Sequence, residues 1–388
     1  MKIANRMEKL APSLTLSITA LANELKAAGK DILSFSAGEP DFDTPQVVKD
    51  AAIKAINEGK TKYTAVEGIK ETKQAIINKL KKDHNLDYSL DKIVISNGAK
   101  HSLFNLAQAL IDEGDEVIIP SPYWVTYPEL VVYSGGVPVF IETDESTEFK
   151  ITAKQLKEKI TPKTKILMLN SPSNPTGSIY SKDELLAIGE VLKGTDIVVL
   201  SDEMYEKLIY KGKKFTATAE VSEDMYNRTV TINGLSKSVA MTGWRFGYVA
   251  CPNSALAKAM SKLQGQVTSN VNSMTQYAAI VALEGEANKD IEMMRVEFEK
   301  RKDYAVKAIN NISKLSCYDP DGAFYLFINI KKYSNDSMIF CADLLESKGV
   351  ALVPGLAFGM EGYVRLSFAT SMKAIEDGIN RIKEFVEK

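Results

Sequence analysis

Histidine and cysteine are both scarce in this chain of 388 residues. The two histidines are His84 and His101, so a metal site built on histidine is not expected, and an organic cofactor is the better expectation. The three cysteines, at positions 251, 317 and 341, are widely spaced. This spacing argues against a disulfide framework and favours a reducing compartment, the cytoplasm.

Long apolar runs and an excess of one charge are also missing. No apolar run approaches the ~20 residues of a membrane helix, and no apolar stretch of a signal peptide follows Lys2 and Arg6. The formal net charge of −2 gives no reason to expect binding to nucleic acid or to a membrane. What remains is the composition of an ordinary globular protein, with 45% hydrophobic and 25% charged residues.

Short β-branched runs alternate with helical patterns from about residue 90 to 250. This alternation predicts an α/β fold with a mostly parallel sheet flanked by helices. Open sheets of this kind bind ligands at the carboxyl ends of their strands, so the polar residues that follow each run are candidates for a site. The strand-like runs are 93–95, 117–119, 137–141, 166–169, 197–200, 229–232 and 248–250.

Other helices and strands are expected on both sides of this region. Helical spacing over 13–28 predicts a helix closed by Gly29, and a short strand is expected at 32–35. Thr44 as N-cap and Pro45 at the first helical position predict a helix that Gly59 closes. A long helix over 286–311 and a smaller α+β domain follow, with elements near 323–330, 338–347, 350–353, 363–368 and 372–387.

Lys237 follows the strand-like run 229–232 and lies among small residues, with Arg245 eight positions further on. A lysine that attacks carbonyl carbon has to lose its proton, and burial or a neighbouring cation favours that loss. Arg245 can supply this cation, or hold a phosphate through its planar guanidinium. Taken alone, a single lysine in this segment is better interpreted as a surface lysine beside a packed turn.

Three further positions carry a chemical signal. Gly98 lies between a strand and a helix, where a glycine lets the backbone approach a phosphate and the helix start offers free N–H groups. Asp202 comes at the end of the run 197–200, where a carboxylate has to be solvated or paired. Arg365 lies inside an apolar run and needs an anion if it is buried, the alternative being an arginine that reaches solvent at a sheet edge.

Ser236–Lys237 followed by residues 240–248, AMTGWRFGY, resembles the cofactor-lysine segment of class I aminotransferases. These are pyridoxal-phosphate enzymes of fold type I, and the resemblance extends over essentially the whole chain. It implies that Lys237 carries pyridoxal 5'-phosphate as a Schiff base and that Arg245 holds the phosphate. It also implies a large cofactor domain over 46–285, and a small domain formed by residues 1–45 together with 286–388.

The resemblance also assigns the contacts of the cofactor ring. Asp202 would keep the pyridinium nitrogen protonated, Trp124 would stack on the ring, and Tyr205 and Asn174 would hydrogen-bond its oxygen. A protonated ring draws in the electrons of a neighbouring carbanion.

The phosphate contacts implied by the resemblance come from two chains. Gly98, Ala99 and Lys100 form the turn at the phosphate, the first two through backbone N–H groups. Tyr63 would reach the phosphate of a neighbouring subunit, which requires at least a homodimer. Gly234 stands where many members carry a serine that bonds the phosphate, so that single contact is in doubt.

Substrate recognition is implied at both ends of an amino acid. Arg365 would clamp the α-carboxylate, and Lys100 resembles the lysine with which one bacterial branch binds the distal carboxylate of aspartate or glutamate. A helix start is slightly unfavourable for a lysine, which supports a functional role for Lys100. The resemblance places further substrate contacts at Gly38, Trp124, Asn174, Ser13 and Thr15.

The implied reaction is transamination from aspartate to 2-oxoglutarate, in which Lys237 takes the Cα proton and returns it. Alternatives are an aminotransferase for aromatic amino acids, alanine or prephenate, and a carbon–sulfur β-lyase on the same fold, which has no use for a cation at position 100. A non-catalytic regulator is a further alternative. It is disfavoured because the fold begins close to Met1, without room for a DNA-binding module.

Overall fold

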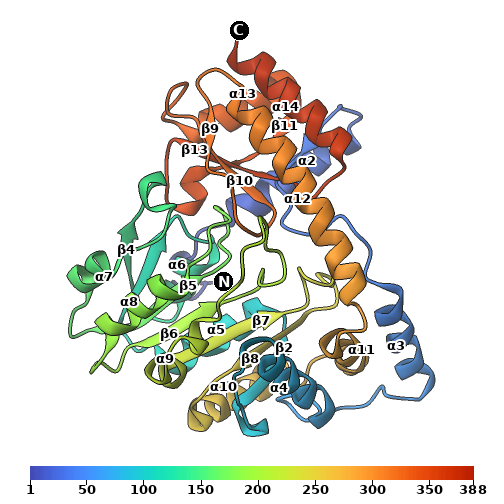
Figure 1. The fold of residues 1–388 in the computed structure, drawn as a ribbon, viewed down its shortest axis with the longest axis vertical. Helices are drawn as coiled ribbons and strands as arrows, with labels where there is room; N and C mark the ends of the chain where they lie inside the picture. The colour runs from blue at the N-terminus through green and yellow to red at the C-terminus, as the bar shows by residue number, and fades with distance from the viewer.

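The computed structural model describes all 388 residues, and a seven-stranded sheet lies at its centre (Figure 1). Strand β8 alone runs opposite to the other six strands, so the predicted α/β fold with a mostly parallel sheet is confirmed. All seven strand-like runs overlap its strands. In spatial order these are β2 (Ile93–Asn97), β8 (Phe246–Ala250), β7 (Thr229–Gly234), β6 (Val198–Asp202), β5 (Thr164–Asn170), β3 (Glu116–Ser121) and β4 (Val137–Glu142).

The strands of this sheet are apolar on both faces, as parallel strands between two helix layers have to be. Successive side chains point to opposite faces, so Val117 and Ile119 pack on one side of β3 and Ile118 on the other. One face is covered by α5 (Ala99–Leu110), α6 (Thr126–Tyr133) and α10 (Ser254–Val267). The other is covered by α4 (Lys70–His84), α7 (Ala153–Lys159), α8 (Lys182–Leu192), α9 (Glu223–Arg228) and α11 (Ser273–Glu284).

A smaller antiparallel sheet is built from the C-terminal part of the chain, drawn in orange and red in Figure 1. Phe298, Phe340 and Ile379, from three helices, pack in the core beside it. Its strand order is β12 (Val353–Pro354), β13 (Tyr363–Ser367), β10 (Tyr325–Asn329) and β9 (Ser316–Cys317). The helices are α12 (Asn288–Asn310), α13 (Ser337–Lys348) and α14 (Met372–Val386).

The N-terminal segment belongs to this C-terminal part in space. Strand β1 (Leu33–Ser34) pairs in parallel with β11 (Val350–Ala351), and Phe35 is buried in the same core as Phe340. Helices α1 (Asn5–Glu8) and α2 (Leu14–Ala27) precede it, and α2 lies against β11 and β12. The domain boundaries at 45 and 285 stay predictions.

One predicted helix start is wrong by a residue. Helix α3 (Gln46–Asn57) has Pro45 as its N-cap, so Thr44 does not cap it and Pro45 is not its first helical residue. The Thr44 hydroxyl instead donates a 2.7 Å hydrogen bond to the carbonyl oxygen of Ala240, which ties the 37–45 loop to the segment that carries Lys237. The predicted end is confirmed, with Gly59 at a φ of 71° just after the C-cap.

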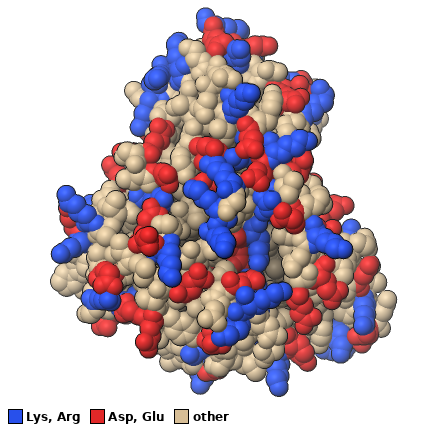
Figure 2. All heavy atoms as spheres, viewed as in Figure 1, with Lys and Arg blue, Asp and Glu red and all other residues tan.

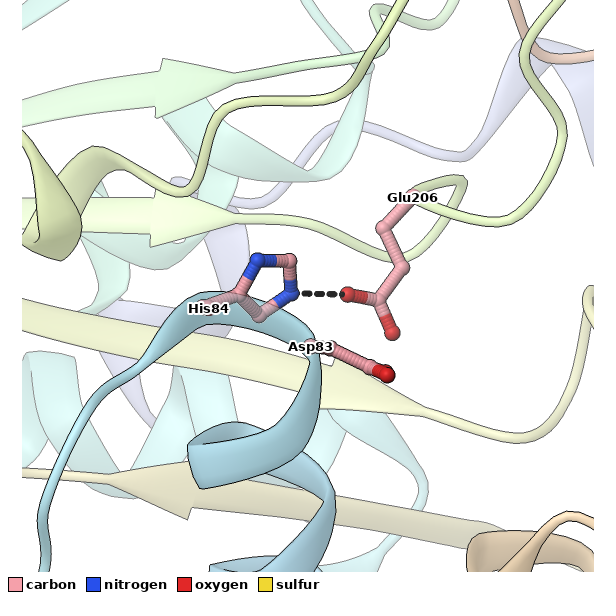
Figure 3. Close-up of side chains that lie close together, drawn as sticks. All are labelled: Asp83, His84 and Glu206. Carbon is pink, nitrogen blue, oxygen red and sulfur yellow. Dashed lines mark hydrogen bonds and ion pairs between the residues drawn. The ribbon is translucent and has the colours of Figure 1, made fainter.

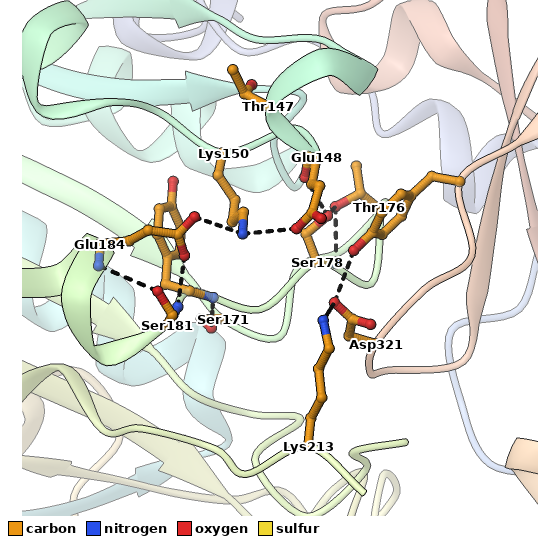
Figure 4. Close-up of polar contacts among 12 residues, drawn as sticks. Thr147, Glu148, Lys150, Ser171, Thr176, Ser178, Ser181, Glu184, Lys213 and Asp321 are labelled. Carbon is orange, nitrogen blue, oxygen red and sulfur yellow. Dashed lines mark hydrogen bonds and ion pairs between the residues drawn. The ribbon is translucent and has the colours of Figure 1, made fainter. Parts of the chain in front are cut away.

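The loop 170–180 is tied to the C-terminal part by two hydrogen bonds, in which the backbone N–H groups of Asp321 and Gly322 donate to the Gly177 carbonyl oxygen at 3.0 and 2.9 Å. Polar side chains around Ser178 and Asp321 surround this contact (Figure 4). The Ser178 hydroxyl donates to the Glu148 carbonyl oxygen at 2.6 Å, and Lys213 lies 2.6 Å from Asp321. On the other side of Glu148, Lys150 pairs with both Glu148 and Glu184. These contacts fix the loop that carries Asn174 beside the sheet that carries Arg365.

The short 3-10 helices are η1 (Leu90–Lys92), η2 (Glu145–Thr147), η3 (Thr218–Glu220) and η4 (Gly355–Phe358). None of the helices combines the length and the apolar character needed to cross a membrane. Basic and acidic side chains are both spread across the face seen in Figure 2, in keeping with the small net charge.

Candidate active site

A cavity of about 380 Å³ opens at the carboxyl ends of the parallel strands. Among the predicted site residues, Gly98 and Tyr63 alone do not line it, and Gly98 lies directly beside it. The predicted residues that do line it are Ser13, Thr15, Gly38, Ala99, Lys100, Trp124, Asn174, Asp202, Tyr205, Lys237, Arg245 and Arg365. The sheet topology therefore brings together residues that are spread over most of the sequence.

Lys237 lies in the turn that follows β7, with its side chain directed into this cavity. Its Nζ atom donates a hydrogen bond to the carbonyl oxygen of Gly38. Burial lowers the pKa of Lys237 to about 8; the carboxylate of Glu39 opposes this shift and the guanidinium of Arg365 adds to it. An amine with such a pKa is partly unprotonated near neutral pH and can act as a nucleophile or a base.

Asp202 ends β6 and is 4% exposed. The Tyr127 hydroxyl donates to its Oδ2 atom at 2.7 Å, and the Met204 backbone N–H donates to Oδ1 at 3.3 Å. Burial raises the pKa of Asp202 to about 6, although the hydrogen bond from Tyr127 lowers it. The carboxylate is thus ionised at neutral pH, and a cationic group in the cavity would stabilise it.

Arg365 lies on β13, between β10 and β12, and is 2% exposed. Its Nη1 atom donates to Asn174 Oδ1 at 3.0 Å, its Nη2 atom donates to the Ser36 carbonyl oxygen at 2.8 Å, and Nε has no partner. The guanidinium carbon is 4.4 Å from the centroid of the Tyr325 ring. Neither acceptor is an anion, so a buried cation faces the cavity with donor capacity to spare.

Tyr205 and Asn174 complete the wall between Asp202 and Arg365. The hydroxyls of Tyr205 and Tyr325 are 2.8 Å apart. The Asn174 backbone N–H donates to Asn170 Oδ1 at 2.8 Å, which fixes the turn after β5. The Asn174 amide, which binds Arg365, is therefore in a defined place.

The turn between β2 and α5 forms the anion-binding side of the cavity. Gly98 is the N-cap of α5 with a φ of 83°, and a Cβ atom there would lie 2.4 Å from Nη2 of Arg245. Arg245 itself donates to the Thr242 carbonyl oxygen at 2.8 Å. A guanidinium beside a helix N-terminus attracts a negatively charged group such as a phosphate.

Lys100 lies at the same helix start, with its Nζ atom 4.9 Å from the centroid of the Trp124 ring. Burial lowers the pKa of Lys100, and the charge of Arg245 lowers it further. Nearby, the Thr15 hydroxyl is buried without a partner, whereas the Ser13 hydroxyl accepts from the Leu16 backbone N–H at 3.5 Å and caps α2. Trp124 and Tyr127 pack edge to face, which holds the Trp124 ring at the cavity wall.

Tyr63 is the predicted site residue that the single chain does not bring into the cavity. Its side chain is 90% exposed. Its predicted role toward a neighbouring subunit stays a prediction.

Tyr127, Tyr325 and Ser36 contribute to the site and were missed by sequence reasoning. Tyr127 lies one helical turn after Trp124, so its place in the same motif was a usable signal. Tyr325 occupies an apolar strand, where an aromatic residue reads as core. Ser36 acts through its backbone carbonyl oxygen, which leaves no trace in the residue type.

Residues 30–382 match the family described as aminotransferase class I and II. The aspartate aminotransferase of Geobacillus stearothermophilus is 50% identical, with 100% of this chain and 99% of that protein covered. The aspartate/prephenate aminotransferase of Nitrosomonas europaea is 46% identical, with 98% of this chain and 99% of that protein covered.

Among solved structures, the aspartate aminotransferase of Rhizobium meliloti superimposes with a TM-score of 0.96 at 41% identity, covering 100% of this chain and 99% of that one. The Thermus thermophilus aspartate aminotransferase with maleate gives a TM-score of 0.95 at 38% identity, covering 99% of each chain. These matches confirm the predicted family and do not favour the carbon–sulfur lyase. With its site residues assembled as described, the chain belongs to the class I and II aminotransferases and is an aminotransferase.

Proposed function

We propose that this aminotransferase binds pyridoxal 5'-phosphate covalently at Lys237 and moves the amino group of aspartate to 2-oxoglutarate. The main support for the cofactor is that a half-buried lysine of lowered pKa, Lys237, and a buried carboxylate, Asp202, face the same cavity. When bound, the cofactor supplies an electron sink for the carbanion formed at the substrate Cα.

The residues of the cavity fit this group. Asp202 offers a buried carboxylate to a protonated ring nitrogen, and Tyr205 and Asn174 offer hydrogen-bond donors to a ring oxygen. Arg245 and the N-terminus of α5 offer donors and positive charge to a phosphate. Gly98 keeps the space beside Arg245 open, because a Cβ atom would reach the guanidinium.

Different residues of the chain bind the substrate and transfer its proton. Arg365 binds the α-carboxylate of the amino acid, which is the anion that its buried guanidinium lacks. The Lys237 amine takes the Cα proton and returns it, a transfer that its pKa of about 8 suits near neutral pH. The buried cavity walls exclude water from these charged groups, which strengthens their interactions.

Lys100 supports a dicarboxylic substrate. It is a second cation that lines the cavity, separate from Arg365, and the unpartnered Thr15 hydroxyl lies in the same wall. Two relatives that are 50% identical over the whole chain are named as aspartate aminotransferases, and the Thermus thermophilus structure contains maleate, a four-carbon dicarboxylate. A cation for each carboxylate is what aspartate and 2-oxoglutarate require.

The absorbance spectrum of the cofactor-loaded protein tests the cofactor and the reaction. Adding aspartate should shift the visible band to shorter wavelength, and 2-oxoglutarate should restore it. Borohydride reduction should fix the chromophore on Lys237, and Lys237→Ala should lose both the shift and the fixation. A chromophore that stays unaltered by aspartate, or is fixed elsewhere, would overturn the proposal.

The role of Lys100 is tested by substituting methionine, which keeps the aliphatic bulk. Lys100→Met should raise the KM for aspartate by about tenfold or more while changing the KM for alanine little, because alanine has no distal carboxylate. Equal effects on the two donors would remove Lys100 from the substrate pocket.

Prephenate is a second candidate acceptor, since relatives at 45–46% identity are named as aspartate/prephenate aminotransferases. It also carries a carboxylate for Arg365 and one for Lys100. Steady-state rates with aspartate as donor, and prephenate in place of 2-oxoglutarate, decide this candidate.

We further propose a homodimer in which Tyr63 reaches the cofactor phosphate of the neighbouring subunit, and a cytoplasmic location for a chain whose three cysteines are all free. The exposed position of Tyr63 supports the shared site. Mixing Lys237→Ala with Tyr63→Ala subunits should restore activity, because each hybrid dimer contains one intact site. Mixtures no more active than Tyr63→Ala alone would contradict it.

A further inference from the structure

A group of charged side chains joins the end of α4 to Glu206, in the turn that follows Asp202 and Tyr205, and Figure 3 shows three of its members, Asp83, His84 and Glu206. Glu206 is its centre: Oε1 is 2.5 Å from Lys79 Nζ, and Oε2 is 3.0 Å from His84 Nε2. The other ring nitrogen of His84 lies 3.2 Å from Glu220. The Lys79, His84 and Glu206 side chains are each less than a tenth exposed, so these contacts are made away from water.

The same residues do not form a metal site. Ligand atoms of Asp83, His84 and Glu206 lie within 4.8 Å of one another. Two ammonium groups already occupy these carboxylates, however: Lys79 Nζ is 3.3 Å and Lys207 Nζ 2.7 Å from Asp83. A divalent cation would have to displace both lysines, so the cluster is an ion-pair network.

The charges of this network are complementary. Burial raises the pKa of Glu206, but Lys79 and His84 outweigh that effect and hold it well below its usual value. Burial lowers the pKa of His84, but its hydrogen bonds to Glu206 and Glu220 raise it to about 9. At neutral pH, Glu206 is therefore a carboxylate between two cations.

The side chains of the turn after β6 point in two directions, some into the cavity and others into the protein interior outside it. Asp202 and Tyr205 face the cavity, whereas Glu203 and Glu206 are buried outside it. Glu203 accepts from the Ser201 hydroxyl at 2.8 Å and from the Thr218 backbone N–H at 3.1 Å. These side-chain contacts hold the turn together with a backbone hydrogen bond, in which the Glu203 N–H donates to the Ile232 carbonyl oxygen of β7 at 2.9 Å.

The network also adjoins the turn that carries Lys237. A small cavity of about 50 Å³ is lined by Lys79 and Glu206 on one side, and by Leu235 and Ser238 on the other. Leu235 and Ser238 flank Lys237 in the sequence. Glu206 therefore lies next to both turns that carry site residues: the turn with Asp202 and Tyr205, and the turn with Lys237.

We propose that Glu206, held by Lys79 and His84, is a positioning residue for Asp202 and Tyr205. The inference rests on the proposed function, because it assigns Glu206 to the placement of Asp202 against the cofactor ring. Glu206 touches neither cofactor nor substrate, and acts by fixing the 202–206 turn to α4. Displacements of about 1 Å in such groups cost up to about a hundredfold in rate.

Glu206→Gln, with Glu220→Gln as matched control, tests this role in the cofactor-loaded enzyme. Each substitution removes one of the two carboxylates that contact His84, but only Glu206 belongs to the 202–206 turn. We expect Glu206→Gln to lower kcat by about tenfold or more, with the KM for aspartate changed less than about twofold. It should also weaken binding of pyridoxal 5'-phosphate to the cofactor-free protein, whereas Glu220→Gln should leave kcat and cofactor binding near wild type.

Two further measurements keep the test decisive. The chain has two histidines, so ¹⁵N-histidine labelling reports the protonation of His84 directly and shows whether each substitution has altered the network. Should Glu206→Gln fail to fold, His84→Gln replaces it, with an expected fall in kcat of about threefold or more.

The proposal is overturned if the substituted enzyme folds, its histidine signals show an altered network, and kcat and cofactor affinity match wild type. It is also overturned if Glu220→Gln lowers kcat as much as Glu206→Gln. A failure of the proposed function is distinct, because Asp202→Asn and Lys237→Ala would then remain active.

Discussion

The hydroxyl of Tyr127 donates a 2.7 Å hydrogen bond to Oδ2 of Asp202, and both side chains are buried. Tyr127 comes from the first turn of α6 and Asp202 from the end of β6, so the contact crosses the floor of the cavity. A hydrogen bond of this kind favours the ionised carboxylate, whereas burial favours the protonated acid. The balance between the two sets the charge of Asp202 near neutral pH.

Replacement of this tyrosine should move the acid side of the pH profile. In Tyr127→Phe the pKa of Asp202 rises, because the hydrogen bond that lowers it is lost and burial remains. The acid limb of kcat/KM for aspartate should shift to higher pH, and the alkaline limb should stay in place. Steady-state kinetics over about pH 5 to 9 check this prediction. An unshifted acid limb would show that ionisation of Asp202 does not determine it.

Replacement of Asp202 should stabilise the cofactor-free protein while removing activity. Burial raises the Asp202 pKa from 3.8 to about 6, so the ionised carboxylate destabilises the fold at pH 8 and ceases to do so as the pH falls below 4. The shift corresponds to at most about 3 kcal/mol, so Asp202→Asn should gain about 1–3 kcal/mol at pH 8 and little at pH 4. Urea unfolding of the apoprotein at the two pH values measures the difference. A gain of equal size at both would point to a cause other than ionisation.

Replacement of Arg365 should weaken the binding of every amino-acid substrate to a similar extent. Arg365→Lys keeps a charge but loses the planar pair of donors, so the KM should rise for alanine and aspartate alike, by about ten- to a hundredfold. Lys100→Met is the comparison, since its effect should be confined to dicarboxylic substrates. If the KM for alanine is unchanged in Arg365→Lys, the α-carboxylate is bound elsewhere.

Two glycines with similar positive φ angles allow the effect of a clash with Arg245 on cofactor binding to be tested. Gly98 and Gly114 have φ angles of 83° and 86°, and a Cβ atom would strike Arg245 at Gly98 but would meet nothing within 4 Å at Gly114. Alanine should cost folding stability at both positions because φ is positive, by about 1–2 kcal/mol at Gly114 and by about 1–3 kcal/mol at Gly98, whose ψ is 160°. Only Gly98→Ala should also weaken binding of pyridoxal 5'-phosphate, by about tenfold or more. Fluorescence titration of the two apoproteins tests this, and equal affinities would show that Arg245 tolerates the methyl group.

Much of the fold could be predicted because its signals are local. Each strand of the large sheet carries a β-branched apolar run, and burial on both faces makes such runs easy to distinguish from the helices between them. The topology then requires the residues after these strands to meet at one edge, which agrees with the placement of Asp202, Asn174 and Lys237, whose roles were implied by the resemblance.

The remainder depended on contacts between distant residues. Thr44 has the chemistry of an N-cap, but its hydroxyl bonds to Ala240 instead, a partner that no local pattern reveals. Ser36 binds Arg365 through its backbone carbonyl oxygen, a contact that the residue type does not reveal. The role of Tyr63 lies outside a single chain and follows from resemblance alone.

The pairing of Leu33 with Val350 has a consequence for synthesis of the protein on the ribosome. More than 300 residues separate the two, so the first strand stays without its neighbour until the chain is almost finished. The large sheet can assemble earlier, since its strands lie between residues 93 and 250. A nascent chain stalled before Val350 would therefore expose an unpaired amino-terminal strand beside a completed central sheet. Chaperones and quality-control proteases would act on this partly folded chain.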